Sequence, residues 1–253
     1  MEFSISGPGI LLRISTGIPF LGDILITETL AVSWLVMILV TGACIWLTRG
    51  MQVENISKKQ VLAEFLVEQA RRLVADHGGS RYERLIPFVA ALFATSLVSN
   101  LISLTGLRSP TADLSTEAAW ALVVFVMITA SKIKGSGFLG YLKGFTIPLA
   151  VMTPFNILSE LATPVSMACR HFGNILSGMV ISGLIYWALA LASSAVFGRL
   201  PGMLGDILGE IPFFSVGIPA VLSLYFDWFS GVMQAFIFSL LTVMYICTQS
   251  QEG

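Results

Sequence analysis

Charged residues are scarce in this sequence. Asp, Glu, Lys and Arg make up 11% of its 253 positions, whereas hydrophobic residues make up 55%. Soluble domains carry about 25% charged residues, so this chain has too little polar surface to cover a water-soluble globule. The mean hydropathy of +0.85 agrees. The lack of charge predicts a chain whose solvent is the lipid bilayer, built as a single membrane domain over residues 1–253.

Histidine, paired cysteine and basic clusters are also lacking. The two histidines lie far apart in the sequence and offer no nucleophile–base pair or metal site, which disfavours an intramembrane enzyme. The three cysteines have no metal-ligand spacing. A net charge of −1 without a basic stripe argues against a nucleic-acid partner. No phosphate-binding loop, nucleophile elbow or zinc-helix motif is present, so we expect neither a catalytic site nor a cofactor.

The N-terminus has no basic segment followed by an apolar core and a small-residue cleavage site. We therefore expect no cleaved signal peptide or transit peptide. The missing transit peptide favours a bacterial plasma membrane as the location.

Long runs with little charge predict membrane-embedded helices. Residues 29–48, 85–107 and 114–131 match the length of about 20 residues that crosses hydrocarbon. Helices over 157–192 and 218–248 would be longer, since roughly 30 residues make about 45 Å at 1.5 Å per residue. We expect these two to tilt strongly or to extend beyond a hydrocarbon layer of about 30 Å. The predicted class is an all-α membrane protein with about five embedded helices.

Residues 57–76 predict a helix of another kind. Apolar side chains recur at helical spacing on one face and charged side chains occupy the other, which is typical of a helix lying on the membrane surface. Ser57 followed by Gln60 resembles a capping box. Glu68 and Arg72 are spaced to pair at i, i+4.

Basic residues indicate the orientation. They gather around the 57–76 helix and after the 114–131 span, and by the positive-inside rule both groups should be cytoplasmic. The first group is Arg49, Lys58, Lys59, Arg71, Arg72, Arg81 and Arg84, and the second is Lys132, Lys134 and Lys143. This distribution predicts an N-terminus outside the cell and a cytoplasmic C-terminus.

Arg170 lies inside the longest apolar helix. Arginine cannot lose its proton, and a charge at membrane depth costs about 2.5–3.5 kcal/mol. A polar stripe on the same helix face accompanies it, at i, i+3 and i+4 spacing. The stripe consists of Thr163, Ser166, Arg170, Asn174 and Ser177. One interpretation is an arginine permanently paired with an acid, and the other is an arginine that lines an aqueous path.

The last predicted helix carries a matching stripe of polar residues. The stripe consists of Ser223, Asp227, Ser230 and Gln234. Asp227 could simply neutralise Arg170, or it could relay protons along an ion path. Gln234 could hydrogen-bond near the guanidinium, or it could only link two helices.

Two motifs around these residues resemble a known family. Residues 164–174, PVSMACRHFGN, resemble the P-x-S-x-x-x-R-L-F-G-N signature of ATP synthase subunit a, and residues 234–245, QAFIFSLLTVMY, resemble that family's last-helix motif. Ser99-Asn100-Leu101 and residues 110–114, PTADL, resemble its preceding helices. Two departures stand out: His171 replaces a leucine, and Met179 lies where relatives carry Glu or His.

The resemblance implies a stator subunit that forms two half-channels against a rotating ring of c subunits. Arg170 would face each ring carboxylate in turn, close to Ser166, Asn174, Ser177 and Gln234. An ion, H⁺ or Na⁺, would enter past Asp113, Asn100 and Asp227 and leave near Glu160. His171 would be a packed residue or a candidate relay. Further implied partners are the b subunits of the peripheral stalk and, indirectly, the F1 sector, where the ATP chemistry takes place.

A stand-alone secondary transporter with Arg170 in its substrate site is the alternative. The prolines between 148 and 164 favour it, because transporters often use broken helices. The absence of an inverted repeat and the small number of spans disfavour it. From the sequence we also expect Asp227→Asn to slow ion flux more than Glu117→Gln.

Overall fold

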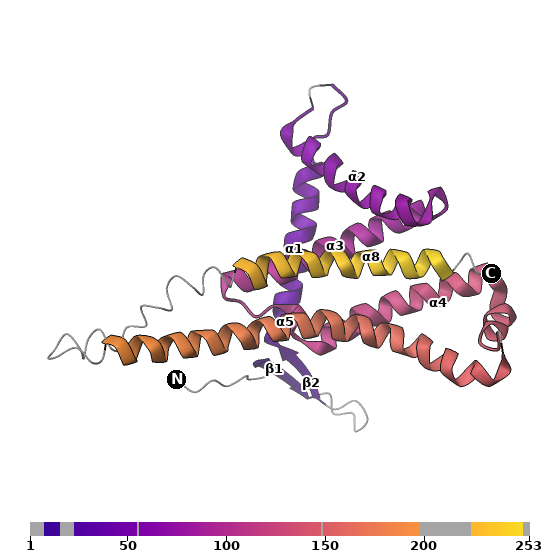
Figure 1. Ribbon diagram of the computed structural model, residues 1–253. Helices are drawn as coiled ribbons and strands as arrows, with labels where there is room; N and C mark the ends of the chain where they lie inside the picture. The colour runs from indigo at the N-terminus through magenta and orange to yellow at the C-terminus, as the bar shows by residue number, and fades with distance from the viewer. Residues whose placement is uncertain (1–7, 16–22, 55, 148, 198–223, 250–253) are drawn as a thin grey trace.

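A computed structural model describes residues 8–15, 23–54, 56–147, 149–197 and 224–249. Within these residues the fold is almost entirely helical, and five helices are long and apolar enough to cross a membrane. The predicted class of all-α membrane protein is therefore confirmed. Figure 1 shows α3 (Ile86–Leu101), α4 (Leu114–Gly144), α5 (Thr153–Phe197) and α8 (Gly231–Gln249) running at a steep angle to α1 (Glu28–Thr48) rather than alongside it.

The first spanning helix is α1 (Glu28–Thr48). Thr27 caps it, because its hydroxyl oxygen accepts a hydrogen bond from the Leu30 amide at 3.4 Å. Val32 and Val36 pack on Ile102, while most of the other α1 side chains are exposed. Exposure of an apolar helix on this scale suits contact with lipid.

A small hairpin, which the sequence analysis did not predict, precedes α1. β1 (Ile10–Ser15) pairs antiparallel with β2 (Asp23–Thr27). Arg13 and Asp23 face each other across it at 3.5 Å. The Glu28 amide donates to the Gly9 carbonyl at 2.9 Å, which ties the hairpin to the start of α1.

The amphipathic helix is α2 (Lys58–Gly78), close to the predicted range. Ser57 accepts from the Gln60 amide at 3.3 Å, so half of the predicted capping box is present. The other half was wrong: the Gln60 side chain does not return to Ser57 but bonds Gln52 and Glu64, because those polar groups lie within its reach. Glu68 and Arg72 pair at 3.0 Å, as expected.

Close packing at its C-terminal end holds α2 against the bundle. A Cβ at Gly78 would lie 2.5 Å from the Cys247 sulfur and 2.8 Å from the Tyr82 ring, so only glycine fits there. Gly79 then ends the helix with φ +65. Val74 is buried nearby with Cys247. Large apolar side chains in the first half of α2, such as Phe65, are exposed.

The next segment turns back into the membrane domain. η1 (Ser80–Leu85) leads into α3 (Ile86–Leu101), and η2 (Ile102–Thr105) ends at Gly106 with φ +80. Together they cover the predicted run 85–107. A short turn, η3 (Pro110–Ala112), then leads to Asp113.

Helix α4 (Leu114–Gly144) is longer than the predicted 114–131. Lys132 and Lys134 end the charge-free run but not the helix, because lysine is a good helix former. The helix is interrupted at Gly137, whose φ of 74° and ψ of 164° are not helical.

Helix α5 (Thr153–Phe197) follows η4 (Ala150–Met152) and has 45 residues, more than the predicted 157–192. Pro164 lies inside this helix, as it lies inside the predicted range 157–192, and it does not interrupt the helix. Proline is tolerated inside apolar membrane helices because neighbouring groups satisfy the freed backbone.

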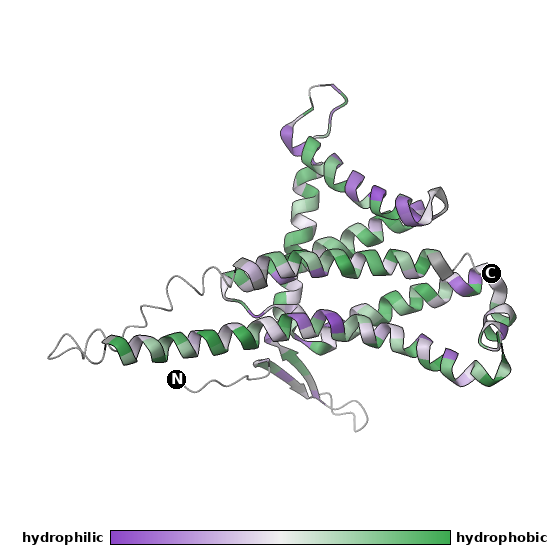
Figure 2. Cartoon of the chain, in the orientation of Figure 1, coloured by the Kyte–Doolittle hydropathy of each residue, from purple (hydrophilic) through white to green (hydrophobic). Residues whose placement is uncertain are grey.

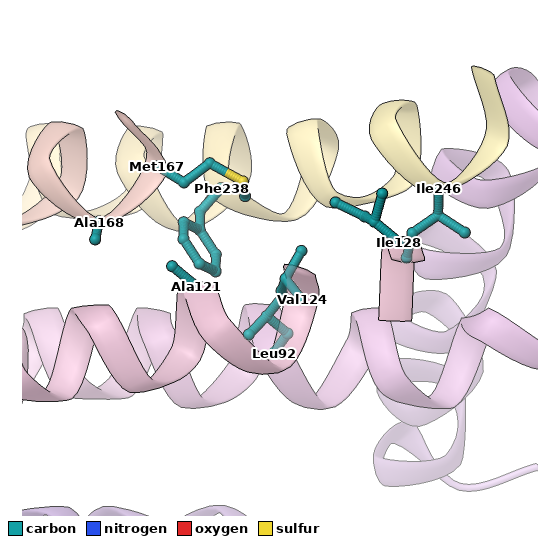
Figure 3. Packing of buried hydrophobic residues seen from close by; sticks show 8 residues of the cluster. All are labelled: Leu92, Ala121, Val124, Ile128, Met167, Ala168, Phe238 and Ile246. Carbon is teal, nitrogen blue, oxygen red and sulfur yellow. The ribbon is translucent and has the colours of Figure 1, made fainter. Parts of the chain in front are cut away.

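The last helical segment begins with η6 (Leu224–Ser230), a stretch of π-helix, and continues as α8 (Gly231–Gln249). Residues 218–223 of the predicted helix 218–248 lie outside the described residues. A small core joins α3, α4, α5 and α8, and its side chains gather between the helices (Figure 3). It consists of Leu92, Ala121, Val124, Ile128, Met167, Ala168, Phe238 and Ile246.

Hydropathy follows this architecture. Figure 2 shows the hydrophobic colour along α1, α5 and α8 and the hydrophilic colour concentrated on α2. Large apolar side chains are exposed on α1, α5 and α8, for instance Ile38, Leu158 and Phe236. Such a surface needs lipid or another apolar subunit to cover it.

Candidate functional site

Arg170 lies near the middle of α5, and its side chain is exposed. Among the described side chains, none forms an ion pair or hydrogen bond with it. Ser166 and Ser177, on the same stripe, are also exposed. The interpretation of a permanent internal ion pair therefore finds no support within the described part of the chain.

The backbone of Asp227 belongs to η6, but its side chain lies outside the described residues, as does Ser223. Gln234 is half-buried on α8.

Asn174, one turn after Arg170, joins α5 to the π-helical segment. Its amide donates to the Ser230 hydroxyl, with 2.5 Å between the two atoms. This contact brings together the two polar stripes that the sequence analysis identified.

A buried polar cluster centres on Asn100 of α3. The Asn100 amide donates to the Gly231 carbonyl at 2.8 Å, and its oxygen accepts from the Thr111 hydroxyl at 2.7 Å. Ser109 lies 2.6 Å from Thr111 and donates to the Ser99 carbonyl at 2.6 Å. Gly231 makes this approach possible, because a Cβ there would be 2.9 Å from the Asn100 Cβ.

His171 and Glu117 extend the cluster. The His171 ring is 1% exposed, and its Nδ1 lies 2.9 Å from Oε2 of Glu117, which is fully buried. The Nε2 atom lies 3.4 Å from the Asn100 amide nitrogen. The Nδ1–Oε2 contact is at ion-pair distance, although the two groups are not aligned for a directional hydrogen bond, and neither Glu117 oxygen has another partner among the described residues.

A cavity of about 550 Å³ lies between α1, α3 and α4, beside β2. Several of its lining side chains are polar. These are Thr27, Thr29, Ser33, Thr95, Ser99, Asp113, Ser115 and Thr116. Thr29 donates to Asp113 at 3.0 Å, and Asp113 also caps α4 by accepting from the Ser115 amide at 3.0 Å.

Glu160 lies about one turn before Thr163, the first residue of the polar stripe on α5, and it pairs with Lys132 of α4. Their charged atoms are 2.5 Å apart, and the side chains are 15% and 16% exposed. The Lys132 ammonium also lies over the Tyr141 ring, 5.9 Å from its centroid. The acid expected to be an exit group is thus bridged to the neighbouring helix.

The predicted site residues fall into separate groups. Asn100 and His171 belong to the buried cluster, Asp113 lines the cavity, Arg170, Ser166 and Ser177 are exposed on α5, and Glu160 lies apart with Lys132. The sequence analysis missed Glu117, Thr111 and Ser109 as members of the cluster. An acid inside the apolar run 114–131 was the signal that could have singled out Glu117.

The fold and the site define a multi-pass membrane protein with an exposed arginine in its longest helix and a buried polar cluster beside it. The family model for the ATP synthase A chain matches residues 30–247. The chain therefore belongs to the ATP synthase subunit a family.

Curated relatives agree over most of the chain. ATP synthase subunit a 1 of Crocosphaera subtropica is 35% identical over 88% of this chain and 86% of its own length. ATP synthase subunit a 1 of Chlorobaculum parvum is 33% identical over 91% of both chains. A relative from Propionigenium modestum, described as sodium ion specific, is 31% identical over 87% of this chain and 73% of its own length.

Proposed function

We propose that this chain is the ion-translocating stator subunit of a rotary ATP synthase, with two half-channels that meet a rotating ring of c subunits. The observation that carries the proposal is the exposed guanidinium of Arg170, which has no partner among the described side chains. A permanent cation on an apolar helix is stable only next to water or an opposite charge. A carboxylate brought by another chain supplies that charge.

The chemistry of Arg170 fits this role. A fixed cation favours the ionised form of a carboxylate that comes close to it. It also repels a free proton or Na⁺, so that ions cannot pass directly between two offset half-channels. The neighbouring Ser166, Asn174, Ser177 and Gln234 supply polar contacts along this face.

The ion path runs from the outer side past Asp113, Asn100 and Asp227, and leaves near Glu160 on the cytoplasmic side. The cavity beside Asp113 and the buried position of Asn100 support the first half of this path. One elementary charge moving through 100 mV supplies about 2.3 kcal/mol. Several charges must therefore cross for each ATP made.

The remaining partners follow from this role. The c ring faces Arg170, the b subunits of the peripheral stalk contact α1 and α2, the F1 sector is reached indirectly, and lipid covers the exposed apolar surface. The chain itself is non-catalytic. It resides in a bacterial plasma membrane with its N-terminus outside and its C-terminus in the cytoplasm.

The transporter alternative loses part of the feature that favoured it. Its expected broken helix between residues 148 and 164 would have created a substrate site. Within the described residues α5 instead continues from Thr153 through Pro164 to Phe197.

Replacement of Arg170 tests the proposal. In the purified complex reconstituted in lipid vesicles, Arg170→Ala should abolish ATP-driven ion uptake, while the complex still assembles with its ring and stalk. Arg170→Lys is the matched control for charge, and it should retain more uptake than Arg170→Ala, though less than wild type, because lysine lacks the planar fork of donors. Normal uptake by Arg170→Ala, or purification of the chain without a ring, would contradict the proposal.

A further inference from the structure

We propose that Glu117 and His171 together form a proton-binding site inside the helix bundle, on the route from the cavity to the Arg170 face. This inference rests on the proposed function and names its cargo as a proton rather than Na⁺. It also assigns a role to Glu117, for which the sequence led us to expect a smaller effect than for Asp227.

The burial of the pair is the first argument. Glu117 is 0% exposed and His171 is 1% exposed, and they come from two different helices, α4 and α5. An acid in such a position is costly unless it is neutralised or fully hydrogen-bonded. Both Glu117 oxygens lack a directional hydrogen bond within the described residues, so the group is not held as a satisfied structural carboxylate.

Asn100 determines which nitrogen of the His171 ring carries the proton. Its oxygen accepts from Thr111 and its nitrogen donates to the Gly231 carbonyl, which fixes the orientation of the amide. The amide nitrogen therefore presents its second hydrogen toward Nε2, 3.4 Å away. Nε2 is then the acceptor nitrogen, and the ring proton lies on Nδ1, next to Oε2 of Glu117.

The charge of the pair follows from this arrangement. With neutral His171 and ionised Glu117 the pair carries a charge of −1, and binding one proton brings it to zero. Release of that proton restores the charge, so no other reactant is needed.

The donor set suits a proton better than a sodium ion. Hard cations prefer several oxygen ligands, whereas an imidazole nitrogen suits protons and softer metals. In the described part of the chain, no group of three His, Cys, Asp or Glu side chains is placed to hold a metal ion.

The position of the pair links it to the cavity. Two lining residues are direct chain neighbours of the cluster: Ser99 precedes Asn100, and Thr116 precedes Glu117. On the other side, Asn174 lies three residues after His171 on α5 and reaches Ser230. The buried cluster therefore adjoins the cavity beside Asp113 through Ser99, whose carbonyl accepts from Ser109, and it adjoins the polar stripe of Arg170 along α5.

The test is ATP-driven uptake by the whole complex in vesicles, with proton uptake followed by a pH-sensitive dye and sodium uptake by a radioactive tracer. Glu117→Gln keeps the size and hydrogen-bonding capacity of the side chain but cannot bind the proton. It should lower proton uptake per assembled complex at least about tenfold. His171→Gln should lower it to a similar degree, whereas Glu117→Asp should retain more uptake than Glu117→Gln.

Ser239→Ala is the matched control, because Ser239 is fully buried on α8 and lies outside the cluster. It should leave uptake within about twofold of wild type. A second measurement is infrared difference spectroscopy of the wild-type complex and Glu117→Gln between acidic and alkaline buffer. The wild type should show a protonated buried-carboxyl band in addition to the bands of the ring carboxylates, and this additional band should be absent from the variant, which a purely structural role would not produce.

The outcomes separate this inference from the proposed function. Uptake by Glu117→Gln within about twofold of wild type, or a wild-type spectrum with no carboxyl band beyond those of the variant, overturns the inference. A wild-type complex that takes up Na⁺ and needs it also overturns the inference, while leaving the stator role intact. Failure of the wild type to take up any ion, or normal uptake by Arg170→Ala, overturns the proposed function itself.

Discussion

At the residue scale, the adjacent residues Arg170 and His171 lie in opposite environments. Arg170 is exposed on α5, whereas His171, about 100° further round the helix, is buried against Glu117 and Asn100. One residue presents a permanent charge to whatever lies outside the chain. The next residue presents a titratable ring to the interior, and together they place a fixed charge and an exchangeable one within a single turn.

The closest backbone contact of the buried cluster gives a residue-scale prediction. In Gly231→Ala, the new Cβ would lie 2.9 Å from the Asn100 Cβ, so α3 and α8 must separate. We expect a loss of about 1–3 kcal/mol in stability, as for other overpacked sites. Thermal unfolding of the purified complex, followed by circular dichroism, measures it.

Gly42→Ala on α1 is the control, since nothing lies within 4 Å of its added Cβ. It should be neutral or stabilising by less than about 1 kcal/mol, because alanine is the better helix former. An equal loss of stability in both variants would show that the close approach of Gly231 to Asn100 is not what destabilises Gly231→Ala.

The sequence predicted individual residues unevenly. Arg170, Asn174 and the Glu68–Arg72 pair could be found because spacing along one helix determines which side chains share a face. The partners of Glu117 and Gln60 could not, since they depend on which groups the fold brings close. Glu117 meets a histidine 54 positions away in the chain, at Nδ1–Oε2 contact distance, and no local pattern contains that information.

At the scale of elements, the apolar runs in the sequence predicted which segments form helices better than they predicted where those helices begin and end. Charge-free runs located α1 and α3, but α4 continues past Lys132, and α5 begins before and ends after the predicted range 157–192. The end of α4 was missed because a lysine limits the hydrocarbon span without stopping a helix. The β1–β2 hairpin was missed because its two strands are short and their alternation is weak.

The Lys132–Glu160 bridge between α4 and α5 gives the element-scale prediction. Both side chains are mostly buried, and Oε1 of Glu160 has no partner among the described residues. Lys132→Met leaves that acid without its cation and should destabilise the complex by about 2 kcal/mol or more. Thermal unfolding of the assembled complex measures the loss.

The double variant Lys132→Met/Glu160→Gln is the matched comparison. It should recover part of the loss, because no uncompensated charge remains between the two helices. The single variant Glu160→Gln completes the comparison. If the stability losses of Lys132→Met and Glu160→Gln simply add in the double variant, the two side chains do not stabilise each other.

At the scale of the whole molecule, the helices of the described chain bury little of their own apolar surface. Large side chains are exposed on α1, α4, α5 and α8, and the shared core is small. A chain of this kind is completed by lipid and by other subunits. The crossing of α5 and α8 over α1 in Figure 1 supports the expectation that these two long helices tilt strongly when α1 spans the bilayer.

The central claim is that the Arg170 face of α5 meets a moving carboxylate of another chain. The most direct measurement is disulfide cross-linking in the assembled complex between a cysteine beside the ring carboxylate and Ser166→Cys, one turn before Arg170, with Cys169→Ser removing the nearby thiol. Cys44, exposed on α1, is the internal control. We predict a link at position 166 and none at Cys44. Linking at Cys44 alone, or no link in a complex that pumps normally, would contradict the account.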